Sequence, residues 1–349
     1  MDLKSLSYEE LQNEILTLGE PKFRAGQIFD WIHKKQAASV DEMSNLSKGL
    51  REKLKENYDF TNLKCARMQE SAIDGTRKFL FELADGNYVE SVWMKYHHGN
   101  SVCISSQVGC RMGCRFCAST LDGLERNLLP GEMLDQIYRI AAITGEKVSN
   151  IVVMGTGEPM DNYENLLKFI RLINDERGMN LSQRNITVST CGIVPGIRKL
   201  AEEGLQITLA LSLHAPTDEK RKALMPIANS YSLSEVMDAC RYYFDKTGRR
   251  VSFEYALVSG VNDRDEEVAE LSRLLKGMNC HINLIPVNPI KEREFKSTDR
   301  LRVLEFQKKL EKNGINVTIR REMGRDIDGA CGQLRRRQMH NAPGGNISG

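Results

Sequence analysis

The sequence predicts an α/β protein built on a parallel sheet, either open or curled into a barrel, with a helical segment and a short antiparallel stretch ahead of it. From about residue 100 onward, short β-branched runs alternate with helical segments, as in repeated βα units. Between about residues 60 and 105 the apolar residues recur with a period of two, which is typical of antiparallel strands. The first 58 residues have apolar positions at helical spacing.

Composition limits the class of protein. A chain of 349 residues allows about two domains at roughly 150 residues each. Its 41% apolar content is ample for a core and excludes general disorder. With 49 basic and 47 acidic residues the net charge is only +2, so any nucleic-acid surface must come from local clustering of charge.

The chain is expected to be cytoplasmic. No stretch approaches the roughly 18 apolar residues that a membrane span needs, so no membrane partner is expected. The start of the chain, Met1–Lys4, lacks the basic region and apolar run of a signal peptide. Nine cysteines, an odd number, do not indicate a secreted disulfide framework. We therefore expect thiols that carry out chemistry or bind metal.

Residues 1–58 are predicted to form a helical accessory domain. Ser7 suits the N-cap of a helix that begins at Tyr8, and apolar residues recur at helical spacing between Phe23 and Ile32. The segment is locally basic, which suits contact with RNA phosphates but also an ordinary solvated helix face. The candidate phosphate contacts in this segment are Lys34, Lys35, Lys48, Arg51, Lys53 and Lys55. Arg320–Arg321 and Arg335–Arg337, near the other end of the chain, are further candidates.

Residues 59–99 are predicted to form a small antiparallel β linker. Apolar residues alternate along Phe79–Leu83, and Asp85–Asn87 has the composition of a turn. On the strand that follows, Glu90 shares a face with Val92. A glutamate on a strand is about as often a solvated edge residue as a functional one, so this position alone decides nothing.

Residues 100–334 are predicted to form the α/β unit, with function at the carboxyl ends of its strands. The predicted strands are Val102–Ser105, Ile151–Met154, Ile186–Thr190, Ile207–Leu213, Val251–Leu257, Ile282–Pro286 and Val317–Arg320. The predicted helices include Glu132–Ile143, Tyr163–Ile173, Leu233–Tyr243, Glu266–Leu275 and Leu301–Leu310. The polar, glycine-rich residues 335–349 are expected to form a flexible tail.

The strongest motif is a run of three cysteines, Cys110, Cys114 and Cys117, directly after the first predicted barrel strand. Three thiolates within eight residues suit a soft-ligand metal centre, which means zinc or iron–sulfur. Bound to a four-iron cubane, three protein thiolates leave one iron open to another ligand. A zinc ion with a fourth ligand and a set of inert buried thiols are the alternatives.

This spacing resembles the radical S-adenosylmethionine (SAM) superfamily. The resemblance implies a partial (β/α)6 barrel, which agrees with the strands counted from the pattern. It also implies a [4Fe-4S] cluster whose open iron is chelated by the amino and carboxylate groups of SAM. One electron from the cluster then cleaves SAM to a 5′-deoxyadenosyl radical.

Polar residues at the other strand ends extend the resemblance. The turn containing Gly157 and Glu158 follows the second barrel strand, where superfamily members have a Gly-Gly-Glu-Pro-like turn that meets the SAM amino group. Residues at later strand ends are implied to reach the ribose and carboxylate. They are Ser189, Ser212, Leu213, His214 and Asn288. Singly each suits a cap or turn, but on one rim they indicate a pocket.

Two further cysteines narrow the family. Cys103 lies on the first barrel strand, and Cys331 lies in a glycine-rich loop that is unsuited to core packing. These segments closely resemble the RlmN/Cfr family of radical SAM rRNA methyltransferases, from the N-terminal helices to Leu334. A generic radical SAM enzyme acting on a small molecule would have no use for the Cys103 and Cys331 pair.

The resemblance implies a mechanism that uses two SAM molecules per turnover. Cys331 takes the methyl group of one SAM, a radical from the second SAM removes a hydrogen from that methyl, and the resulting carbon adds to adenine. Cys103 then resolves the protein–RNA link, which leaves Cys103 and Cys331 as a disulfide. Glu90 occupies the position of the proton acceptor.

The branch, substrates and partners also come from the resemblance. Val108 and Pro159 favour the RlmN branch, which methylates C2, over the Cfr type, which methylates C8 of the same adenine. The implied substrate is 23S rRNA and, for some members, an anticodon-loop adenine in tRNA. A flavodoxin or ferredoxin is the expected electron donor, and a monomer is expected. A non-catalytic, zinc-stabilised RNA-binding protein is the remote alternative.

Overall fold

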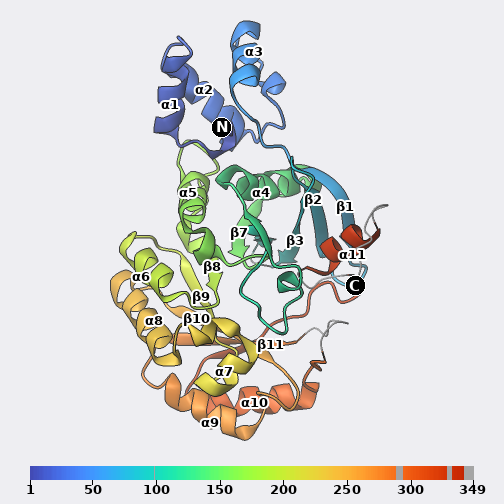
Figure 1. Cartoon of the computed structure of the whole chain (residues 1–349), viewed down its shortest axis with the longest axis vertical. Helices are drawn as coiled ribbons and strands as arrows, with labels where there is room; N and C mark the ends of the chain where they lie inside the picture. The colour runs from blue at the N-terminus through green and yellow to red at the C-terminus, as the bar shows by residue number, and fades with distance from the viewer. Residues whose placement is uncertain (98, 288–293, 328–331, 342–349) are drawn as a thin grey trace.

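The computed structural model describes residues 1–97, 99–287, 294–327 and 332–341, with side chains as far as residue 338. Two predicted site residues, Asn288 and Cys331, lie outside these ranges. Helices occupy the beginning of the chain, as the apolar spacing predicts, and form a group of their own in Figure 1. They are η1 (Leu3–Ser5), α1 (Tyr8–Thr17), α2 (Phe23–Phe29), η2 (Asp30–Lys34), η3 (Val40–Glu42) and α3 (Lys48–Asn57).

Local capping and one buried ion pair hold these helices in place. Ser7 caps α1 in a capping box, because its hydroxyl accepts the Glu10 N–H at 3.2 Å while Glu10 accepts the Ser7 N–H at 2.7 Å. Lys4 Nζ lies 2.5 Å from Asp135 Oδ1, and both side chains are fully buried. This pair joins the N-terminal segment to α4 (Pro130–Thr144).

One mixed sheet of ten strands forms the centre of the molecule, in the order β1-β2-β3-β4-β7-β8-β9-β10-β11-β12. The strands from β4 onward are all parallel, which confirms the predicted βα architecture. The strands are β1 (Lys64–Glu70), β2 (Arg77–Glu82), β3 (Tyr88–Tyr96), β4 (Gly99–Ile104), β7 (Val148–Val153), β8 (Ile186–Thr190), β9 (Thr208–Ser212), β10 (Val251–Leu257), β11 (Cys280–Pro286) and β12 (Val317–Ile319).

The predicted antiparallel linker is part of this same sheet. β3 pairs with β4 in antiparallel fashion, with Val92 opposite Cys103, and β4 pairs with β7 in parallel fashion, with Cys103 opposite Val152. β4 therefore has hydrogen-bonding partners on both edges, and the sheet continues through it. The antiparallel strands are confirmed, but the alternation did not predict that they continue the parallel sheet, because period-two alternation reports which face is buried and not which strand lies alongside.

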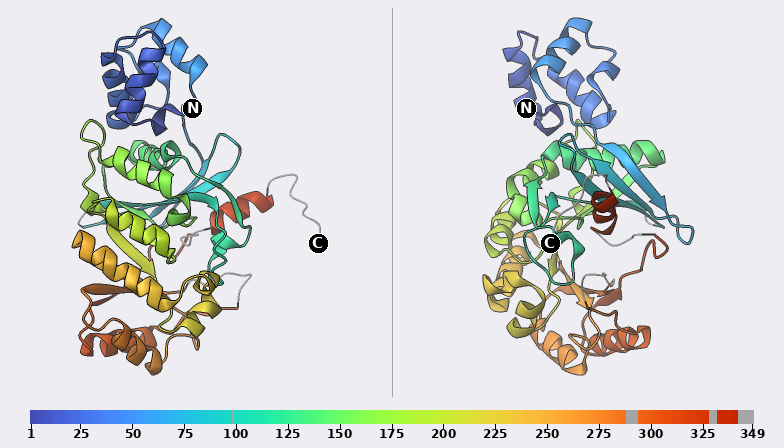
Figure 2. Two further views of the ribbon diagram at one scale, coloured as in Figure 1. Left: turned by 60° about the vertical axis from the view of Figure 1, so that its left-hand side comes forward. Right: turned by 45° about the vertical axis from the view of Figure 1, so that its right-hand side comes forward.

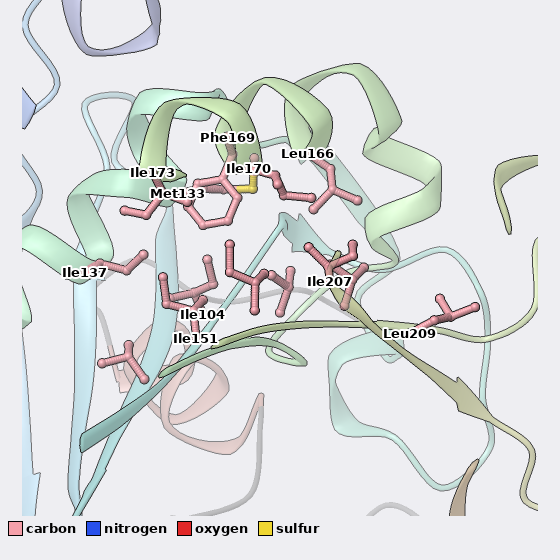
Figure 3. Close-up of a cluster of buried hydrophobic side chains, with 14 of the residues drawn as sticks. Ile104, Met133, Ile137, Ile151, Leu166, Phe169, Ile170, Ile173, Ile207 and Leu209 are labelled. Atoms are coloured by element: carbon pink, nitrogen blue, oxygen red, sulfur yellow. The ribbon is translucent and has the colours of Figure 1, made fainter. Parts of the chain in front are cut away.

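Helices cover the outer face of the parallel strands (Figures 1 and 2). They are α4, α5 (Tyr163–Asn174), α6 (Val194–Glu202), α8 (Leu233–Thr247), α9 (Asp265–Leu274) and α10 (Arg300–Lys312). The short helix α7 (Asp218–Leu224) lies instead at the carboxyl ends of β8 and β9. Figure 3 shows Ile137 of α4 and Phe169 of α5 facing Ile104 and Ile151 of the sheet. All four side chains are fully buried, and burial of each stabilises the fold by roughly 1.5–3 kcal/mol. No helix in the described ranges has the length and apolar composition needed to span a membrane.

The end of the described chain departs from the predicted flexible tail. Residues Gln333–Asn341 form the helix α11, which packs against β3 and is red in Figure 1. Its start is held by Glu90, which accepts the backbone N–H of Gly332 and of Arg335, each at 2.6 Å. The prediction of a loose segment from Arg335 is wrong for these residues, because a carboxylate from a distant strand caps a polar sequence that lacks a strong helix signal of its own.

Candidate active site

A cavity of about 530 Å³ lies at the carboxyl ends of the parallel strands. Polar and sulfur-containing side chains from the loops after β4, β7, β8 and β9 line it, as expected for a parallel α/β sheet. Nine of the predicted site residues contribute to its wall. They are Cys103, Cys110, Cys114, Cys117, Gly157, Glu158, Ser189, Ser212 and His214.

The cysteine loop is framed by a short hairpin, β5 (Gln107–Gly109) with β6 (Leu124–Asn127). Cys110 donates its backbone N–H to Gly123 O at 2.7 Å, which fixes the start of the loop. Gly109 has φ +76°, and a Cβ at this position would lie 2.0 Å from Gly123 O. Only glycine therefore fits between the two strands, and the loop direction depends on it.

The three cysteines offer a soft donor set at one wall of the cavity. Cys110 and Cys114 are buried, and Cys117 is half-buried. Burial raises the pKa of the Cys110 thiol to about 12 and also raises that of Cys114, so both favour a cationic partner that replaces the proton. Among the described residues no group of three or more His, Cys, Asp or Glu side chains is arranged around a single metal ion.

The turn after β7 presents a buried carboxylate to the cavity. Glu158 is 3% exposed, and its two oxygens accept the backbone N–H groups of Met160 at 3.0 Å and Cys191 at 2.7 Å. Burial raises the pKa of Glu158. Gly157 has φ +113°, and a Cβ there would lie 2.7 Å from Ser106 Oγ, so the turn is pressed against the loop after β4.

His214 lies on the opposite side of the cavity, after β9. Its Nδ1 accepts the backbone N–H of Ala256 at 2.9 Å, and its ring meets the Phe116 ring edge to face at 4.8 Å. Burial lowers its pKa to about 3, so the ring is neutral. Since Nδ1 is an acceptor, the proton resides on Nε2, which leaves His214 with one donor for a ligand.

Leu213, the residue before His214, does not line the cavity. Its side chain is fully buried in the main hydrophobic core, and only its backbone stays near the rim, where its N–H donates to Glu254 O at 3.0 Å. Glu254 itself lines the cavity and was not predicted. It is 6% exposed, and burial raises its pKa. Its signal in the sequence is a carboxylate in the middle of the mostly apolar strand β10.

Cys103 lies on β4 and Glu90 on the neighbouring strand β3, and of the two only Cys103 lines the cavity. Cys103 packs with Val92 of β3 beside the cavity. Glu90 is 3% exposed and 3.0 Å from Lys78 Nζ, so the alternative of a solvated edge residue is excluded. Through Gly332, Glu90 also contacts the backbone immediately after Cys331. The eight cysteines in the described ranges form no disulfide with one another, and the Cys103–Cys331 pairing remains a prediction because Cys331 lies outside those ranges.

Comparisons with known proteins agree with this architecture. The model of the radical SAM superfamily matches residues 104–272, and that of the ribosomal RNA large subunit methyltransferase N-terminal domain matches residues 1–59. A probable dual-specificity RNA methyltransferase RlmN from Lachnospira eligens is 68% identical over 340 residues, which are 97% of each chain. The chain belongs to the RlmN family of radical SAM methyltransferases.

Two further comparisons support the fold and the family. A relative from Lachnoclostridium phytofermentans is 63% identical over 96% of this chain and 94% of its own. The crystal structure of a radical SAM methyltransferase from Sphaerobacter thermophilus has a TM-score of 0.92 and 44% identity, and the match covers 95% of this chain and 98% of that one. The radical SAM family implies a [4Fe-4S] cluster and SAM, and the three cysteines fit that cluster. The alternative of a non-catalytic, zinc-stabilised protein is therefore wrong.

Proposed function

We propose that this chain methylates C2 of an adenine in 23S rRNA, and of an anticodon-loop adenine in tRNA, with Cys331 as a covalent methyl carrier and two SAM molecules per turnover. The RlmN-family relatives are named dual-specificity RNA methyltransferases, which supports an RNA substrate. The observation that carries the proposal is the contact of Glu90 with Gly332. In this contact Glu90 lies against the residue next to the predicted carrier, on a strand that pairs with the strand of Cys103, which supports its role as proton acceptor.

The cavity residues divide into two groups in this proposal. Cys110, Cys114 and Cys117 hold the cluster, while Glu158 and His214 orient SAM with Ser189 and Ser212. Asn288, which lies outside the described residues, stays a prediction for the same role. When bound, the cluster and SAM supply a carbon-centred radical by one-electron cleavage of the sulfonium. The neutral His214 donates from Nε2, and the Glu158 carboxylate, which already accepts two backbone N–H groups, suits the SAM ammonium.

The chemistry of the substrate explains why a carrier is needed. C2 of adenine is an electrophilic amidine carbon, so it does not attack the methyl group of SAM directly. A Cys331 thiolate does so, forming a carbon–sulfur bond as the sulfonium bond breaks. The carbon-centred radical takes a hydrogen atom from the S-methyl group of Cys331, and the resulting methylene radical adds to C2. Glu90 then takes the C2 proton. The Cys103 thiolate attacks the Cys331 sulfur, so that a disulfide forms as the carbon–sulfur bond breaks, the methyl carbon gains a proton, and the one unpaired electron leaves for a one-electron acceptor, a role that the oxidised cluster would fill.

The position of methylation is proposed from two residues. Val108 is buried in β5, and Pro159 begins the turn η5 (Pro159–Asn162) beside Glu158. Both favour C2, and C8 methylation by the same groups is the alternative. Mass mapping of the modified adenosine separates the two products.

We propose that residues 1–58 form a separate domain that contacts RNA. Residues 59–99 then form the linker, and residues 100–334 form the barrel. Several cations of the N-terminal helices already have acidic neighbours, such as Lys53 with Glu20 at 2.8 Å. Exposed pairs of this kind contribute only about 0–1 kcal/mol, so phosphates can replace the carboxylates. A base must be unstacked to reach the cavity, which favours a single-stranded loop. We further propose a cytoplasmic monomer reduced by a flavodoxin or ferredoxin.

The test is the mass of the Cys331 peptide from protein purified anaerobically with its cluster. One added methyl, absent in a Cys110→Ala variant, is the expected result. Incubation with RNA should remove that methyl and yield C2-methyladenosine. An unmodified Cys331 in protein shown to hold iron and sulfide would contradict the carrier mechanism.

A further inference from the structure

A buried arginine, Arg221, lies beside the cysteine loop and does not line the cavity. Arg221 is carried by α7 and is fully buried. Its Nη2 donates to Cys191 O at 2.5 Å and to Ser212 O at 3.4 Å, the carbonyls at the ends of β8 and β9. Its Nε and Nη1 have no hydrogen-bond partner within the described part of the chain.

This guanidinium is also a buried charge without an ion pair. Among the described residues no carboxylate lies within 4 Å of it, and Asp218, one turn earlier on α7, acts only at longer range. Lys4 is a cation that is equally buried, but its Nζ is paired with Asp135 Oδ1 at 2.5 Å. A buried cation costs several kcal/mol unless an anion compensates it. Arg221 therefore requires negative charge from another source.

The groups that face Arg221 indicate that source. Cys114 packs with Cys191, Leu224 and Met225 in one cluster at the end of α7. Arg115 donates its backbone N–H to Leu224 O at 2.9 Å, so the cysteine loop is docked on the helix that carries Arg221. Arg221 donates to the carbonyl of Cys191, and Cys191 packs in the same cluster as Cys114, so a single residue separates the guanidinium from the Cys114 thiol.

We propose that Arg221 is a positioning residue whose fixed positive charge stabilises the negative charge of the thiolate-ligated cluster and favours its reduced form. A [4Fe-4S] core held by three thiolates carries a net charge of about −1, and of about −2 after a one-electron donor reduces it. A cation buried beside one ligand interacts more strongly with the second state than with the first. The inference rests on the cluster of the proposed function.

A purely structural role is the competing explanation, because Arg221 also joins the ends of two strands. Two substitutions separate charge from hydrogen bonding. Arg221→Lys keeps the charge but loses the planar fork, and Arg221→Gln keeps an amide donor for Cys191 O but loses the charge. Arg249→Gln is the control, since Arg249 also has a buried Nε without a partner and donates to Thr208, at the opposite end of β9.

The first readout is the midpoint potential of the reconstituted cluster, followed by electron paramagnetic resonance during titration with dithionite. Arg221→Gln should reduce the ratio of reduced to oxidised cluster at fixed potential by about tenfold, which is 59 mV for a one-electron couple. Arg221→Lys and Arg249→Gln should stay close to the parent. The second readout is the rise in Tm on cluster assembly, which should be smaller for the Gln variant than for the Lys variant.

The possible outcomes are distinct. A Gln variant that assembles no cluster, beside a Lys variant that does, also supports the charge role. Three results would overturn the proposal. The first is an equal midpoint potential in all variants, and the second is a cluster that is unchanged in Arg221→Gln but altered in Arg221→Lys. The third is an equal loss of cluster in both variants. Iron and sulfide in the parent protein separate the two proposals. If the parent holds no cluster, the proposed function fails and this inference with it, whereas a cluster indifferent to Arg221 contradicts this inference alone.

Discussion

Lys78 and Glu90 form a buried ion pair across two neighbouring antiparallel strands, with 3.0 Å between Nζ and Oε2. The lysine side chain is 0% exposed and the glutamate side chain 3%. The same carboxylate accepts the N–H groups of Gly332 and Arg335. One side chain therefore links an N-terminal strand to the helix that follows the predicted carrier cysteine.

Removal of the lysine should be strongly destabilising. Lys78→Met leaves Glu90 buried with its charge uncompensated, and we expect a loss of about 3–5 kcal/mol in the free energy of unfolding. Chemical denaturation measures this loss. As a matched control, Lys95→Met removes the partner of exposed Glu146 and should cost less than about 1 kcal/mol. Equal effects of the two substitutions would show that the buried pair contributes nothing special.

Substitution of the glutamate should separate the two halves of the reaction. Glu90→Gln keeps the shape of the side chain but removes the proton acceptor. We expect methylation of Cys331 by SAM to continue, while methyl transfer to RNA slows by about 10²- to 10⁴-fold. Hydrogen exchange at Gly332 and Arg335 should become faster, because both amides lose a charged acceptor. Unchanged exchange and unchanged RNA methylation would contradict both roles of this residue.

Gly109→Ala should disrupt the cysteine loop. The new Cβ would lie 2.0 Å from Gly123 O at a backbone conformation of φ +76°, so the hairpin must shift. We expect the iron and sulfide content after reconstitution to fall well below that of the parent. Gly145→Ala is the control, because Gly145 has a similar φ of +68° but open space around it. That variant should lose about 1 kcal/mol of stability and keep its cluster.

The N-terminal helices should loosen at acidic pH through His33. This residue is fully buried between Phe29 and Tyr138, and burial lowers its pKa from 6.5 to about 3. The unfolded chain binds a proton that the folded chain does not. The stabilisation is therefore complete above about pH 6.5 and falls by about 1.4 kcal/mol per unit as the pH drops toward 3. His33→Phe should remove this slope in denaturation measured between about pH 5 and 6.5. An unchanged slope would assign the acid sensitivity to other groups.

The sequence by itself determined the features that depend on local spacing. Alternation and β-branched runs located the parallel strands within a few residues, because neighbouring side chains on a strand point to opposite faces. The spacing of Cys110, Cys114 and Cys117 indicated the radical SAM family, since all three cysteines come from one loop. The helices α6 and α7 were not predicted.

Only the tertiary structure decided how distant segments meet. It showed that the antiparallel strands extend the barrel sheet, that Leu213 belongs to the core, and that Glu254 and Arg221 lie at or behind the cavity. It also placed Glu90 against Gly332, a contact that spans 242 positions of the chain. No local pattern records such a pair, because its energy comes from burial and charge that exist only after the sheet has formed and the helix has docked on it.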